Sequence, residues 1–244
     1  MEVHHSHDKH HKKNWKSYLF EFFMLFLAIT AGFLVENMRE KRVEHMRERE
    51  YIHSFLNDLS MDTSKVNYTK PLNDTLMMKI DSMVTYINNH VLTDEQLAKA
   101  YQIKDEWLSS LNNVVFTERT ISQLKSAGGL RLIEKQNSSD LIVQYYEFVS
   151  VCNEQANYYK YDQTALIELS YKLFYKDYNK RFGNNWDAAR KILKEHNEIL
   201  QEFINRLIDF KEVVSSYNQL LNQIKIYNHY ITPLIKKDYK ITDR

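Results

Sequence analysis

The amino-acid sequence predicts an all-α protein, and three observations support that prediction. The 244 residues include only four glycines and two prolines, whereas sandwiches, barrels and doubly wound sheets need many turn residues. One stretch near the N-terminus is almost wholly apolar, and apolar residues recur at helical spacing after it. We therefore expect an N-terminal transmembrane helix that continues into a helical stalk, followed by an antiparallel bundle of long helices.

The apolar stretch runs from Tyr18 to Val35 and contains Glu21 as its one ionisable residue. Eighteen helical residues cover about 27 Å, close to the ~30 Å hydrocarbon core of a bilayer. Trp15, Lys16 and Tyr18 lie where aromatic and basic side chains anchor a helix at the membrane interface. The alternatives are a buried core helix and a cleaved signal peptide. The length and basic flank disfavour the first, and the lack of a small-residue cleavage site disfavours the second.

The orientation of the span depends on the lysines and arginines at its two ends. Four lysines precede the span, and five basic residues follow it within the first turns, so the two counts are nearly equal. The lysine cluster of the short tail favours an N-terminus inside the cell. We expect a single-pass protein of the cell inner membrane whose C-terminal domain is periplasmic.

Turn signals divide the rest of the chain. Pro71 predicts a helix break, with a new helix over about 73–89. Thr93 and Gln96 fit a capping box that opens a helix running to about Leu111. We expect four parts: a His- and Lys-rich tail (1–16), the transmembrane helix (17–36), the helical stalk (37–70) and the helical bundle domain (71–244).

The later helices are predicted from caps and glycines. Thr117 is expected to cap a short helix that the glycines at 128–129 end. Nothing breaks the helical pattern from 137 to Gly183, so one helix of over forty residues, rich in tyrosine, is expected there. A last long helix is expected to reach about Tyr239, bent or ended near Pro233.

Two stretches of the sequence resemble a known family. The opening WKSYLFEFFMLFLAITAGFLVENMRE, with Asn37 and Arg39 at the exit of the span, is followed by Leu56-Asn57-Asp58-Leu59. This pattern resembles uncharacterised single-span membrane proteins common in Bacteroidetes-type bacteria. A second stretch, TISQLKSAGGLRLI at 120–133 followed by Tyr145-Tyr146-Glu147, resembles a segment of related domains of unknown function. The resemblance implies a bacterial membrane protein and no assigned activity.

One face of the span is a candidate contact site. Spacings of four and three residues place on that face Glu21, Leu25, Ala28, Gly32 and Val35. Ala28 and Gly32 form a small-xxx-small pair, which allows two helix backbones to approach closely. Glu21 then has three interpretations: a polar contact in an assembly, a proton-handling group in an ion-coupled complex, or a side chain that reaches headgroup water.

The N-terminal tail contains half of the ten histidines: His4, His5, His7, His10 and His11. Clustered imidazoles bind zinc, nickel or copper without a defined fold. No cysteine or fixed carboxylate accompanies them, so such binding would be adventitious, and the alternative is a polar tail that only titrates. We expect no dedicated cofactor.

Several functional classes are disfavoured. A net charge of +1 argues against nucleic acid as a partner. Metalloprotease, P-loop and nucleophile-elbow motifs do not occur, and Cys152 in an aromatic-rich helix is more typical of a buried thiol than of a nucleophile. We expect no catalytic activity.

Three functions remain open. The favoured one is a membrane-anchored helical interaction module, such as a scaffold, accessory subunit or assembly factor. The others are an extracytoplasmic ligand-sensing bundle that acts through a partner, and an ion-coupled single-span subunit that uses Glu21. The expected partners are the membrane and either a second copy or another membrane protein.

Overall fold

Helices form the secondary structure of this chain wherever the computed structural model describes it, at residues 14–88, 92–126 and 128–242. No strand occurs in these ranges, so the all-α prediction is confirmed. The elements are α1 (Trp15–Ile87), α2 (Asp94–Ile103), the π-helix η1 (Lys104–Leu108), α3 (Arg119–Ser126), the 3-10 helix η2 (Gly129–Leu132), α4 (Gln136–Ser170), α5 (Tyr178–Phe182), α6 (Asp187–Glu195) and α7 (Asn197–Asp238). The chain divides into two compact units, residues 1–50 and 51–244.

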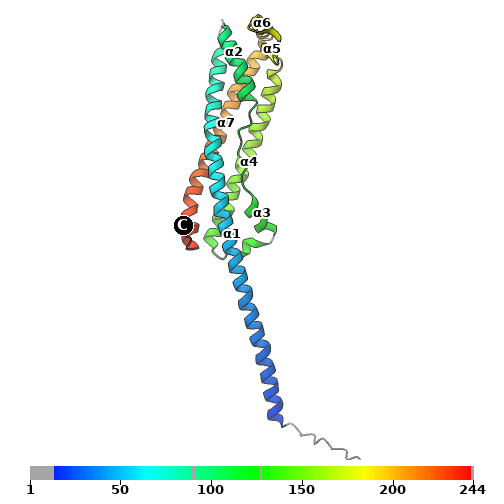
Figure 1. Cartoon of the computed structure of the whole chain (residues 1–244), viewed down its shortest axis with the longest axis vertical. Coiled ribbons are helices and arrows are strands. Elements are labelled where there is room, and N and C mark those ends of the chain that lie inside the picture. Colours follow the sequence, from blue (N-terminus) through cyan, green and yellow to red (C-terminus); the bar gives the residue numbers. More distant parts are fainter. Residues whose placement is uncertain (1–13, 89–91, 127, 243–244) are drawn as a thin grey trace, which may run out of the picture. The chain divides into compact units, whose positions relative to one another are not determined.

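The second unit is an antiparallel bundle of long helices (Figure 1). Side-chain contacts give the directions. Asp62 and Asn73 on α1 contact Tyr145 and Tyr159 on α4 in the same order, so these helices are parallel. The partners of α1 on α7 run in reverse order, because Leu59 contacts Asn228 while Asn73 contacts Asn218. A fourth leg, formed by α2, η1, the extended segment 111–118 and α3, descends beside them (Figure 1).

The core of the bundle is filled by aliphatic and aromatic side chains from all three long helices. The largest fully buried rings are Phe55, Tyr145, Tyr159, Phe174, Phe203, Phe210 and Tyr217, with Phe174 just after α4. Tyr159 packs edge-on against Phe210 and Tyr217, with centroid distances of 5.2 and 5.9 Å. Each such side chain contributes roughly 1.5–3 kcal/mol on burial. The periodicity that predicted helices therefore also marks the core face.

The bundle begins earlier than expected. Residues 51–70, assigned to the stalk from the sequence, belong to the second unit, and their core face contains Ile52, Phe55 and Val66. The predicted break at Pro71 is wrong, because α1 continues through it to Ile87. Proline removes one backbone hydrogen bond, but burial of residues on both sides of Pro71 outweighs that loss.

A second boundary also differs. The unbroken helix expected up to Gly183 ends at Ser170, and a turn containing Asp177 in the left-handed region (φ 52°) leads into α5. No glycine or proline marks this break. Rings at this end of the bundle account for it: Tyr101 accepts a hydrogen bond from Tyr175 N at 3.1 Å, and Tyr178 stacks on Trp186 with centroids 4.6 Å apart.

Of the other local predictions, some are confirmed and some are not. Thr93 and Gln96 form the reciprocal capping box at the start of α2. The helix expected to reach about Leu111 instead changes to a π-helix at Lys104 and gives way to extended chain. The last helix passes through Pro233 and ends at Asp238.

Candidate functional site

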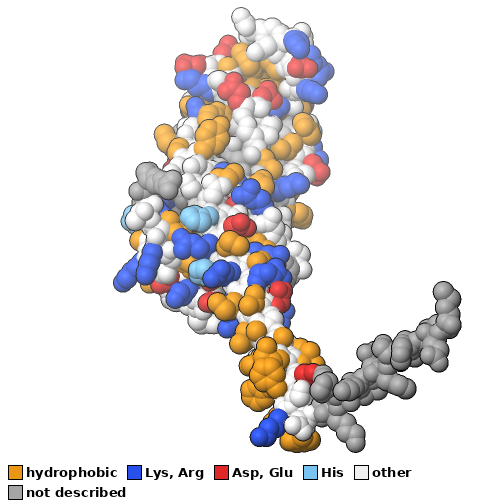
Figure 2. All heavy atoms as spheres, turned by 60° about the horizontal axis from the view of Figure 1, so that its bottom comes forward, with side chains coloured by type: hydrophobic (Ala, Val, Ile, Leu, Met, Phe, Trp, Pro, Cys, Tyr) orange, Lys and Arg blue, Asp and Glu red, His pale blue; other side chains and the backbone are white. Residues whose placement is uncertain are grey.

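The first unit exposes the apolar segment on every side. None of the side chains from Tyr18 to Val35 is buried in the described structure, and this part of α1 is long and apolar enough to cross a membrane. Figure 2 shows hydrophobic side chains gathered on this segment, while charged side chains are spread over the bundle. Because water does not favour so large an apolar surface, the segment requires a lipid or protein environment.

The residues singled out in the span lie on this exposed helix. Glu21, Leu25, Ala28 and Gly32 share one face by their spacing, and a Cβ atom at Gly32 would meet nothing within 4 Å in the described chain. Packing within the described chain therefore does not require glycine at position 32. The anchors expected at the interface, Trp15, Lys16 and Tyr18, occupy the first turn of α1, where the Trp15 side chain is 78% exposed.

The candidate metal ligands lie outside the described residues. His4, His5, His7, His10 and His11 all precede residue 14, where the description begins. Within the described ranges, no group of three or more His, Cys, Asp or Glu side chains is arranged to hold a metal ion.

The bundle contains a polar site that the sequence did not single out, built on two carboxylates of α1. Asp58 and Asp62 lie one helical turn apart, and both side chains are fully buried. Asp62 Oδ1 accepts hydrogen bonds from Thr117 N at 2.9 Å and from Thr117 Oγ1 at 2.8 Å. Lys65 Nζ lies 3.1 Å from the same oxygen, so the buried negative charge has a cationic partner.

Asp58 makes the equivalent contact one turn away. Its Oδ2 accepts hydrogen bonds from the hydroxyl of Thr120 and, at 3.3 Å, from Thr120 N. The Arg119 guanidinium lies 3.6 Å from Oδ1, an oxygen that has no hydrogen-bond donor in the described structure. Since an unpaired buried carboxylate costs several kcal/mol, this ion pair offsets the desolvation of Asp58.

Together the two carboxylates hold the start of α3. The first backbone N–H groups of a helix have no partner within the helix, and negative charge is favoured at that end. Thr117 was expected to cap this helix, but its hydroxyl instead donates to Asp62, while Thr120 N donates to Asp58. The cap of α3 is therefore supplied by α1 from more than fifty residues away.

This site joins the two stretches that carry the family resemblance. Asp58 lies in the first stretch, and Thr120 opens the second. Tyr145, which follows the second stretch, donates to Asp62 Oδ2 at 2.6 Å. Burial raises the pKa of the Tyr145 hydroxyl, and the nearby Asp62 charge adds to the rise. A pair of aspartates four residues apart on an otherwise apolar helix face was the sequence signal that could have identified this site.

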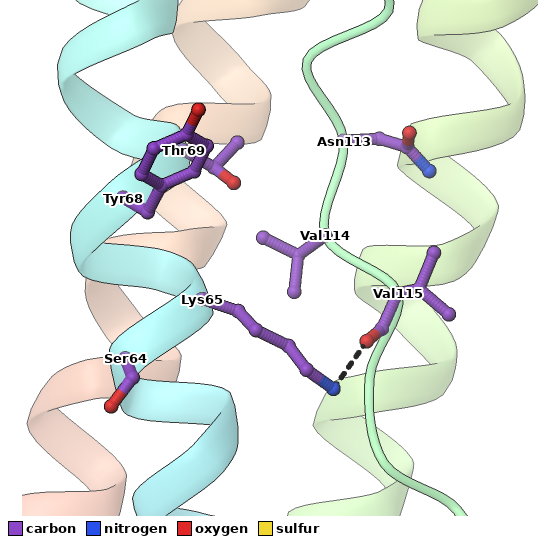
Figure 3. A pocket seen from close by; sticks show the side chains of 7 residues that line it. All are labelled: Ser64, Lys65, Tyr68, Thr69, Asn113, Val114 and Val115. Carbon is purple, nitrogen blue, oxygen red and sulfur yellow. Dashed lines mark hydrogen bonds between the residues drawn. The ribbon is translucent and has the colours of Figure 1, made fainter.

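A groove lies beside the polar site, between α1 and the extended segment (Figure 3). It has a volume of about 460 Å³ and is lined by Ser64, Lys65, Tyr68, Thr69, Asn113, Val114 and Val115. Lys65 crosses its floor and donates to Val115 O at 2.7 Å (Figure 3). The groove therefore offers hydroxyl groups, one cation and the exposed ring of Tyr68.

Cys152 is buried in α4, as expected from its position. Burial raises the pKa of its thiol to about 12. The nucleophilic thiolate is then scarce at neutral pH, so this cysteine acts as a small core side chain.

Comparisons with known proteins do not assign a family. No family profile and no solved structure matches this chain. A curated protein, the phenylalanine–tRNA ligase beta subunit of Mycoplasma capricolum subsp. capricolum, is 24% identical over 226 residues. The match includes 75% of this chain, which spans only 28% of the length of that subunit.

Proposed function

We propose that this chain is a membrane-anchored helical interaction module, such as a scaffold, accessory subunit or assembly factor, without catalytic activity of its own. The observation that carries the proposal is the wholly exposed apolar segment from Tyr18 to Val35, which continues in α1 toward a bundle that fills its own core. A lipid bilayer buries this apolar segment, and the bundle remains outside the hydrocarbon core.

The buried polar groups support a structural role for the interior of the bundle. Asp58 and Asp62 are occupied by donors from the segment that begins α3. A catalytic carboxylate must reach substrate, whereas both of these are fully enclosed. Function then belongs to the outer surfaces of the bundle and to the span.

The groove beside Lys65 favours a second candidate, a ligand-sensing bundle that acts through a partner. Its hydroxyls and its single cation suit a small polar or anionic ligand. The three acceptors already bonded to Lys65 make this the weaker candidate, because a ligand would have to compete with Asp62, Val115 O and Thr117.

Membrane anchoring and orientation are tested together. Leu25→Arg combined with Phe26→Arg should release the full chain from carbonate-washed membranes, because each arginine costs about 2.5–3.5 kcal/mol at the centre of a span. The matched control, Leu25→Phe with Phe26→Leu, should remain in the membrane pellet. A C-terminal reporter active only in the periplasm should be active on the control protein. Release of the control from the membrane, or activity only of a cytoplasmic reporter, would contradict the anchor or the orientation respectively.

A further inference from the structure

One stripe of exposed and half-exposed side chains on α1 carries no charge over about eight turns, or ~42 Å, and the exposed Asp74 and Asp81 border it. The residues on this face, called the α1 seam below, are Asn57, Met61, Ser64, Tyr68, Pro71, Thr75, Met78, Ser82 and Thr85. Met61, Tyr68 and Met78 are exposed by 44%, 74% and 68%. On a chain with 27% charged residues, a continuous uncharged face of this length marks a surface adapted to contact.

The spacing of the α1 seam is that of a coiled coil. Its residues alternate at intervals of four and three, the heptad pattern by which two helices pack side by side. The seam lies opposite the core residues Leu59, Val66 and Ile80, so it is not used by the bundle. Short side chains such as Ser64 and Ser82 allow a second helix to approach, and Met61, Tyr68 and Met78 supply the larger knobs.

Charged residues flank the α1 seam, and one pair of them suits a parallel copy. Asp74 and Asp81 lie along one edge, and Lys65 and Lys79 lie along the other. In a parallel pair of helices, a residue on the first edge faces the residue five positions later on the second edge of the partner. Asp74 of one copy then faces Lys79 of the other, twice by symmetry. An antiparallel pair would instead place Asp beside Asp and Lys beside Lys.

We propose that a second copy of this chain packs in parallel against the α1 seam. This inference rests on the proposed function, because anchoring both copies in one membrane imposes the parallel direction. Anchoring also raises the effective concentration of one bundle near another. The α1 seam is rich in serine and threonine and buries little apolar area, so its intrinsic affinity is low and it needs this raised concentration. Asp74 and Lys79 reach the surface but also have contacts within the bundle. The half-exposed Asp74 accepts from Asn218 at 2.8 Å and lies 3.8 Å from Lys70, and the ammonium of Lys79 lies 5.9 Å from the Trp107 ring, so pairing with a second copy would add to these contacts.

Disulfide crosslinking of the full chain in native membranes tests the direction of packing. In a Cys152→Ala background, Ser64→Cys, Thr75→Cys and Ser82→Cys should each crosslink to the same position of a second copy. Thr164→Cys, exposed on α4, is the matched control and should crosslink at least about tenfold less. Crosslinking only between Ser64→Cys and Met78→Cys would show antiparallel packing and overturn the proposal, as would equal crosslinking at Thr164→Cys and the seam.

A charge exchange tests the role of Asp74 and Lys79. Asp74→Lys or Lys79→Asp alone should weaken dimerisation about threefold to tenfold, as expected for two exposed ion pairs. The double variant restores opposite charges and should recover the wild-type yield of the Ser82→Cys crosslink. Thermal unfolding of each variant separates lost pairing from lost folding, since Asp74 also accepts a hydrogen bond from Asn218. If the double variant folds but does not recover the wild-type crosslink yield, the pairing of Asp74 with Lys79 between copies is wrong.

Carbonate extraction of the same membranes keeps the two proposals apart. A protein that remains in the pellet but gives no seam crosslinks contradicts the parallel dimer alone. A wild-type protein found in the supernatant contradicts the anchor and, with it, the membrane argument for the dimer.

Discussion

Tyr145 on α4 donates a hydrogen bond of 2.6 Å to Asp62 Oδ2 on α1, 83 residues earlier in the chain. The other oxygen of Asp62 accepts from the backbone and hydroxyl of Thr117. One carboxylate therefore ties together a long helix, a second long helix and the segment that leads into α3. Because it is fully buried, each donor that it loses leaves a charge less well compensated.

Removing the Tyr145 hydroxyl should destabilise the bundle. Tyr145→Phe retains the ring contact with Phe55, whose centroid lies 5.5 Å away, but removes one donor to Asp62. We expect a loss of about 1–3 kcal/mol in the free energy of unfolding, measured with denaturant. Tyr161→Phe is the matched control, because that ring is 72% exposed and its change should have no measurable effect. Equal stability of the two variants would show that the contact with Asp62 is not needed.

Removing the Thr120 hydroxyl should loosen the start of α3. Thr120→Val retains the shape of the buried side chain but removes the hydroxyl donor to Asp58. We expect a loss of about 1.5–3 kcal/mol, typical of hydrogen bonds to charged groups, and faster amide exchange in residues 119–126 than in α4. Thr164→Val, at an exposed position that bonds only within α4, should leave both measurements unchanged. Uniform exchange across the bundle would argue against a local cap.

Alkaline pH should destabilise the bundle through its buried tyrosines. Burial raises the pKa of the Tyr217 hydroxyl to about 12, against ~10 for an unfolded tyrosine. Because the folded pKa is the higher one, this stabilisation is fully present below about pH 10 and is lost as the pH rises towards 12. Tyr217→Phe removes one ionisable proton, so the free energy of unfolding should fall less steeply with pH, by about 1.4 kcal/mol per pH unit.

The measurement for Tyr217 is denaturant unfolding at several pH values between about 9 and 12. Tyr217→Phe should also be less stable near neutral pH, since Val114 N loses its hydrogen-bond acceptor at 2.9 Å. Tyr171→Phe, at an exposed ring, should retain the wild-type slope. An unchanged slope in Tyr217→Phe would exclude this tyrosine as a source of the alkaline transition.

Helix contacts made by the span should depend on the size of the side chain at position 32. A Cβ atom there meets nothing within this chain, so Gly32→Leu should reduce crosslinking along positions 21–35 only if a partner helix packs on that face. Phe33→Leu, on another face, should be tolerated. Glu21→Gln keeps the hydrogen-bonding shape without the charge, so an assembly contact should survive and an ion-coupled function should be lost. Equal crosslinking around the helix would make the span a simple anchor.

Much of the helical content could be predicted from local sequence. The Thr93 capping box and the long C-terminal helix depend on side chains within a few residues of one another. The helix break predicted at Pro71 was wrong because the lost backbone hydrogen bond is visible in the local sequence, whereas the burial that outweighs it involves distant segments of the chain. The end of α4 at Ser170 was missed because packing of rings such as Tyr101 and Phe174, rather than a glycine or proline, turns the chain there.

The helical content of this protein and its one apolar segment able to span a bilayer can be predicted without a structure, because both follow from composition and periodicity along the chain. The tertiary structure was needed to show that residues from Tyr51 onward belong to the bundle, that Asp58 caps α3 and that Asp62 binds Thr117 just before this helix. Burial and hydrogen bonding depend on which distant segments of the chain meet, and local sequence does not encode that. The local sequence predicts that Asp58 and Asp62 are solvated helix residues. They are buried only because Thr120 and Thr117, respectively, fold against them.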